Sequence, residues 1–89
     1  MGAKPTVTDA RVRQKIREVL NMAPGYGKTE TMLLEFVNEL TGGGVEIEQL
    51  RAGIEWNHGQ DYVRRHVNED TDEVEWFITK HGIAKETLK

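Results

Sequence analysis

Apolar residues recur at helical spacing over the first two thirds of the chain. Thr8 can cap a first helix, and the positions that follow at steps of three and four residues are apolar: Val12, Ile16, Val19 and Leu20. Pro24 and the glycines that follow it end this helix, because proline cannot continue it. The opposite face of the helix is predicted to be exposed and basic: Arg11, Arg13, Lys15 and Arg17.

Two further helices are predicted before residue 60. Thr29 or Thr31 can cap the second helix, whose apolar positions again repeat at helical steps: Met32, Leu33, Phe36, Val37 and Leu40. The third helix begins near Val45 or Glu46 and has its own apolar face: Ile47, Leu50 and Ile54. Gly53 within it costs about 1 kcal/mol relative to alanine, which indicates close packing against another helix.

After residue 59 the periodicity changes from helical to alternating. This predicts a β-hairpin from about Tyr62 to Thr79, with Val67 paired to Val74 across an acidic turn. Thr79 can cap a short final helix. The predicted core combines the apolar positions of the helices and the hairpin: Ile16, Leu20, Leu33, Phe36, Val37, Leu50, Ile54, Val63, Trp76 and Ile78.

Three helices, a two-stranded hairpin and a closing helix give an α+β, mainly α, fold of the winged helix-turn-helix type. The chain has 89 residues, 37% of them hydrophobic, which is enough for one domain. We expect a flexible segment at residues 1–7 and a single domain at residues 8–89. The start has no apolar core of a signal peptide and no run of about 18 apolar residues occurs, so a cytoplasmic protein without membrane contact is expected.

Several short segments, in their order and spacing, resemble small winged-helix proteins of Mu-like phages and prophages. Between Val12 and Glu86 the resemblance rests on segments 23–26, 33–40, 49–51 with Trp56, 62–63 and 78–82. Such proteins are similar to bacterial winged helix-turn-helix transcription-regulator domains. The resemblance implies a winged-helix fold and, by analogy, nucleic-acid binding in transcription regulation or another DNA transaction. This sequence departs from the pattern at Asn57, where such helices usually place an apolar residue, and in its acidic wing tip.

The net charge of −3 is distributed unevenly along the chain. Residues 1–28 carry six basic and two acidic side chains, a local charge of +4. Residues 29–59 carry one basic and six acidic side chains, a local charge of −5, and the remainder has a charge of −2. Because a duplex binder concentrates positive charge where it meets phosphates, the acidic middle of the chain opposes a conventional DNA-reading third helix.

Seven residues are candidates for DNA contact. Arg64 and Arg65 on the hairpin can reach phosphates or a minor groove, and Arg11 and Lys15 on the first helix can approach the DNA backbone. On the third helix, three residue types are suited to base edges: Gln49, Arg51 and Asn57.

Three glutamates of the same helix would repel phosphates: Glu46, Glu48 and Glu55. The alternative is therefore a protein-protein interaction module that uses the acidic face of helices two and three.

No enzymatic, metal or cofactor chemistry is predicted. The chain has no cysteine, and its three histidines lack the spacing that would bring two of them to one metal ion. No nucleophile, base and orienting group can be assembled from the sequence. A homodimer is left open, because a single module of this size offers little DNA interface.

Overall fold

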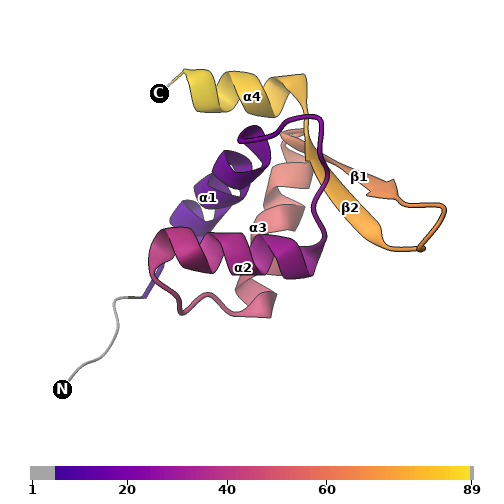
Figure 1. Ribbon diagram of the computed structural model, residues 1–89. Helices are drawn as coiled ribbons and strands as arrows, with labels where there is room; N and C mark the ends of the chain where they lie inside the picture. The colour runs from indigo at the N-terminus through magenta and orange to yellow at the C-terminus, as the bar shows by residue number, and fades with distance from the viewer. Residues whose placement is uncertain (1–5, 89) are drawn as a thin grey trace.

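The computed structural model describes residues 6–88 and contains four helices and one β-hairpin (Figure 1). The elements follow in the order α1 (Asp9–Asn21), α2 (Glu30–Thr41), α3 (Ile47–Gly59), β1 (Val63–Val67), β2 (Val74–Ile78) and α4 (Lys80–Thr87). The predicted order of three helices, hairpin and closing helix is confirmed. No described helix is long and apolar enough to cross a membrane.

Threonine side chains define where three of the four helices begin. The hydroxyl oxygens of Thr8, Thr29 and Thr79 accept hydrogen bonds from backbone N–H groups in the first turns of α1, α2 and α4. Each cap satisfies a donor that would otherwise have no partner within the helix. Helix α3 has Glu46 at its N-cap position, and the Glu46 side chain makes no capping hydrogen bond.

The core forms where α1, α2, α3 and the base of the hairpin meet. Nine of the ten predicted core residues are buried, but Phe36 is 38% exposed, so that assignment was wrong. Leu33 and Val37 already occupy the inner side of α2, and Phe36 points away from them. Close packing at Gly53 is confirmed, because a Cβ there would lie 2.8 Å from Ile16 Cδ1.

The hairpin has the predicted register, with Val67 opposite Val74 and Arg65 opposite Trp76. The segment between α1 and α2 adds one further antiparallel bridge. Lys28 N donates to Trp76 O at 3.0 Å, and Trp76 N donates to Lys28 O at 2.8 Å. This single bridge has no alternating pattern and was missed from the sequence. It attaches the start of α2 to the base of the hairpin.

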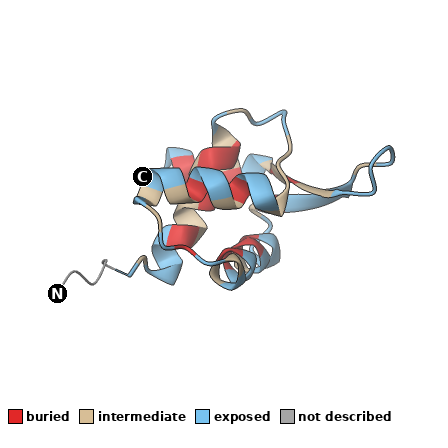
Figure 2. Ribbon diagram, turned by 60° about the horizontal axis from the view of Figure 1, so that its bottom comes forward, coloured by how far each residue is buried: buried red, intermediate tan, exposed pale blue. Residues whose placement is uncertain are grey.

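The hairpin projects away from the helices. Figure 1 shows α2 crossing in front of α1 and α3, with α4 at one end and the hairpin extending to one side. Figure 2 shows buried positions concentrated in the helices, whereas the outer part of the hairpin is exposed. Of the five β1 residues, only Val63 is buried.

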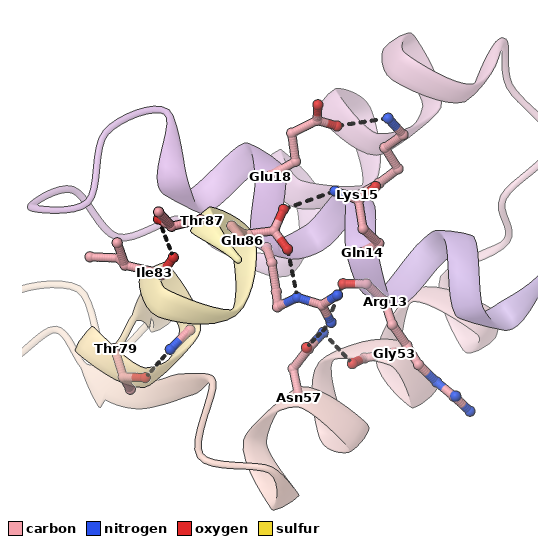
Figure 3. A network of polar contacts seen from close by, with 12 residues as sticks. Arg13, Gln14, Lys15, Glu18, Gly53, Asn57, Thr79, Ile83, Glu86 and Thr87 are labelled. Carbon is pink, nitrogen blue, oxygen red and sulfur yellow. Dashed lines mark hydrogen bonds and ion pairs between the residues drawn. The ribbon is translucent and has the colours of Figure 1, made fainter. Parts of the chain in front are cut away.

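Arg17 is buried and does not lie on the exposed basic face predicted for α1. Its Nε donates to Glu86 Oε2 of α4 at 3.0 Å. Figure 3 shows the neighbouring bond, in which Gln14 Nε2 donates to Glu86 Oε1 at 2.8 Å. A buried charge is tolerated when it is paired and hydrogen-bonded. The Arg17–Glu86 pair therefore ties the closing helix to the first helix.

Candidate functional site

Gln49, one of three candidates for base contact on α3, is used to hold the N-terminal segment. Its side-chain Nε2 donates to the backbone oxygen of Val7 at 2.7 Å and to Asp9 Oδ1 at 3.1 Å. Val7 is also half-buried against the core. At least one of these hydrogen bonds would have to break before this amide could donate to a base.

Arg51, the second candidate, is exposed and forms an ion pair with Glu30 at the start of α2. Arg51 Nε donates to Glu30 Oε2 at 2.7 Å and to Oε1 at 3.3 Å. This hydrogen bond and the negative charge of Glu30 raise the pKa of Arg51 above its ordinary value. The pair joins α2 to α3 and neutralises the one basic residue of the exposed α3 face.

Asn57, the third candidate, lies in the core with none of its surface exposed. Its Oδ1 accepts from Arg17 Nη1 at 2.9 Å, and its Nδ2 donates to the backbone oxygens of Gly53 at 2.9 Å and Arg13 at 3.1 Å (Figure 3). A side chain in this position cannot reach a base edge, so the assignment of Asn57 to DNA readout is corrected. The amide instead links α1 to α3.

Three carboxylates remain on the exposed side of α3. Glu46, Glu48 and Glu55 are all exposed, and none forms an ion pair within the described part of the chain. They are the residues predicted for the alternative, protein-binding use of this helix. The outer surface of α3 is therefore acidic, with its single arginine already paired.

An open hollow lies where α2, α3 and β2 meet. It has a volume of about 220 Å³ and is lined by polar and apolar side chains: Glu30, Arg51, Ile54, Glu55 and Trp76. Trp76 is buried, and its indole nitrogen has no hydrogen-bond partner among the described residues. The apolar part of this hollow therefore lies beside an acidic residue of α3.

The hairpin carries basic residues on β1 and acidic residues on its turn. Arg64 and Arg65 on β1 are exposed and take part in no ion pair among the described residues. The Arg64 guanidinium lies 4.4 Å from the centre of the Phe77 ring, a favourable cation–π distance. The turn beyond them bears four exposed carboxylates: Glu69, Asp70, Asp72 and Glu73.

The basic residues of α1 are not brought together with those of the hairpin. Arg11 is exposed, whereas Lys15 Nζ forms a 2.8 Å ion pair with Glu18. The Arg13 guanidinium lies 4.6 Å from the centre of the Trp56 ring. Although α1 packs against β2, Figure 1 shows the start of α1 on the side of the fold away from the outer part of the hairpin.

A row of exposed apolar side chains on α2 was missed by the sequence analysis. Met32, Phe36 and Leu40 recur every four residues, and each is more than one third exposed. From the sequence, Phe36 was placed in the core with Leu33 and Val37, and Met32 and Leu40 were given only as apolar positions at helical spacing. At 100° per residue the five positions form one continuous arc of about 140°, so the spacing alone does not separate the exposed Met32, Phe36 and Leu40 from the buried Leu33 and Val37.

The described residues, 6–88, do not form a metal-binding site. No three His, Cys, Asp or Glu side chains in this range are grouped so that they could hold an ion.

Two solved structures share this fold. A transcriptional regulator of the MarR family from Silicibacter pomeroyi superposes with a TM-score of 0.73 and 19% sequence identity, over 88% of this chain and 47% of the regulator. A mutant of ZitR from Lactococcus lactis superposes with a TM-score of 0.61 and 9% identity, over 97% of this chain and 56% of ZitR. This chain thus spans about half the length of either protein. No protein-family model and no curated protein matches the sequence.

These similarities define the class of fold. The four helices and the two-stranded antiparallel hairpin form a winged helix-turn-helix of the kind found in bacterial transcription regulators. At this position in the fold, α3 is the helix that such domains can place in a DNA major groove and the hairpin is the wing. The surface chemistry of α3 therefore bears directly on whether this helix can enter a DNA groove.

Proposed function

We propose that this protein is a winged-helix interaction module that binds a basic surface of a protein partner through the acidic face of α2 and α3. The proposal rests on which polar side chains of α3 remain available to a partner. Gln49, Arg51 and Asn57 are engaged within the fold, and Glu46 and Glu48 are among the exposed residues that remain. Arginine and lysine side chains of a partner are the groups that complement these carboxylates.

Electrostatics disfavours a major-groove complex of the same helix. Docking α3 into DNA would bring Glu48 and Glu55 within the roughly 8–10 Å over which charges interact at physiological salt. The turn of the hairpin bears further exposed carboxylates. For a basic protein surface the same charges accelerate association and orient the partner.

Binding of duplex DNA through the wing is the second candidate function. Arg64 and Arg65 are exposed and form no ion pair among the described residues, which leaves both free to contact phosphates. The winged-helix fold of transcription regulators supports a role in transcription regulation or another DNA transaction. We further propose that the protein is of the phage or prophage type, on the strength of its sequence resemblance to the Mu-like group.

A titration followed by amide NMR distinguishes the two candidates. An oligolysine peptide should shift resonances of α3, and replacing Glu48 and Glu55 by glutamine should remove those shifts. Matched replacement of Glu69 and Glu73 on the hairpin turn should leave them in place. All four residues are exposed, so each variant should keep the fold.

A labelled random duplex provides the opposing arm. Fluorescence anisotropy at low salt, where electrostatic attraction is least screened, should show no binding by the wild-type protein. Duplex binding that disappears when Arg64 and Arg65 are changed to alanine, together with no peptide shifts on α3, would establish the wing-mediated DNA function and contradict the first proposal.

A further inference from the structure

The outer face of α2 carries a short apolar row, which we name the α2 stripe: Met32, Phe36 and Leu40. These side chains are 41%, 38% and 37% exposed, respectively. They lie at positions i, i+4 and i+8, so the stripe runs along two turns, or about 12 Å, of the helix. Single exposed apolar residues are ordinary on protein surfaces, whereas adjacent ones form a patch to which a partner can bind.

The fold leaves the α2 stripe uncovered for a structural reason. Leu33 and Val37 fill the inner side of α2, and both are fully buried against the rest of the core. The Lys28 side chain approaches from outside, with its ammonium 5.6 Å from the centre of the Phe36 ring. In Figure 1, α2 crosses in front of α1 and α3, so no helix among residues 6–88 lies over its front.

The charges beside the stripe restrict what can cover it. Glu35 and Glu39 are exposed next to it, and α2 contains no basic residue. Two copies of this chain joined by an antiparallel pair of α2 helices would bring these glutamates toward their counterparts, which is unfavourable. A partner with an apolar row flanked by lysine or arginine complements both the stripe and its acidic border.

We propose that the α2 stripe binds an amphipathic helix of the protein partner, with basic residues along the edge of its apolar row that faces Glu35 and Glu39. This inference rests on the proposed protein-binding function and names the element of the partner that is recognised. An amphipathic helix docked along a hydrophobic surface is anchored by side chains at i, i+3, i+4 and i+7. The aromatic ring of Phe36, at the centre of the stripe, is the expected anchor.

The probe is a synthetic helical peptide with leucine at those anchor positions and lysine along one edge of the leucine row. Isothermal titration with the full chain should show binding. Phe36→Ser should weaken it about tenfold or more, the loss typical of a central anchor residue. Val67→Ser is the matched control, because Val67 is a 41% exposed apolar residue on the hairpin. This control variant should bind the peptide as the wild type does.

Charge variants and altered peptides test the basic flank. Replacing Glu35 and Glu39 by glutamine should weaken binding and reduce its dependence on salt. A peptide with glutamate in place of lysine, and one with the same composition in scrambled order, should bind at least tenfold more weakly, or about 1.4 kcal/mol.

Three results would overturn the inference. The first is no binding of the lysine peptide. The second is binding that survives Phe36→Ser but is lost when Glu48 and Glu55 become glutamine, which would leave the acidic α3 site standing and remove the stripe. The third is a wild-type dimer in sedimentation that Phe36→Ser converts to a monomer, which would identify a second copy of the chain as the occupant.

Discussion

Asn57 is expected to support the fold and not a ligand. Replacing it by alanine removes the acceptor of Arg17 Nη1, which lies 2.9 Å from Asn57 Oδ1 in a fully buried environment. The carbonyls of Arg13 and Gly53 are retained by their own helices, so they keep backbone hydrogen bonds. Arg17 keeps its 3.0 Å bond to Glu86, but one buried donor of a charged group loses its partner.

An unpaired buried donor costs about 1–3 kcal/mol, and more on a charged group. We therefore expect Asn57→Ala to lower the free energy of unfolding by about 3 kcal/mol. A domain of this size loses about 4–8 °C of melting temperature per kcal/mol, so the midpoint should fall by about 12–24 °C. Urea denaturation followed by circular dichroism and tryptophan fluorescence measures the free energy, and the two probes together check two-state unfolding.

Exposed Gln60→Ala serves as the control and should change stability by less than about 0.5 kcal/mol. The double variant Asn57→Leu/Arg17→Met should lose less free energy of unfolding than the two single variants added together, because it removes both partners of the buried Arg17–Asn57 hydrogen bond. A loss below about 0.5 kcal/mol for Asn57→Ala would refute the reasoning, since it would show that the amide is not needed to satisfy Arg17.

Two further substitutions test how the closing helix is attached. A Cβ at Gly82 would lie against the backbone oxygen of Tyr62. Gly82→Ala should therefore destabilise the protein by about 1–3 kcal/mol in thermal denaturation. The control is Gly59→Ala, where nothing lies within 4 Å of the added Cβ, and it should be neutral or stabilising. Thr79 accepts from Gly82 N at 3.0 Å and donates to Asp61 O at 2.6 Å, so Thr79→Ala should cost about 1–2 kcal/mol, and unchanged hydrogen exchange in α4 would contradict this.

The fold could be predicted because its determinants are local in sequence. The helical spacing around Ile16 and the alternation around Trp76 each report burial of one face within a short window. Threonine caps such as Thr29 mark helix starts by a contact over three residues. Phe36 was misassigned because spacing shows that a residue shares a face with other apolar residues but does not show whether a neighbouring element covers that face.

The candidate site was harder to predict because its contacts join residues far apart in the chain. Arg51 is paired with Glu30, 21 positions away, and Asn57 with Arg17, 40 positions away. A polar residue on a helix has the same local signature whether it points to solvent or to a buried partner. Only the packing of α1 and α2 against α3 decides which polar groups remain available for a ligand.

The winged-helix fold and the charge of its surface are set by different residues, which is why one does not determine the other. Leu50 and Ile54 hold α3 in place from its buried side. Glu48 and Glu55 lie on the outer side, where exchanging a charged residue for another has little effect on stability. A domain of this class can therefore keep the geometry that places α3 at the surface. The same surface can then recognise cationic groups in place of phosphates.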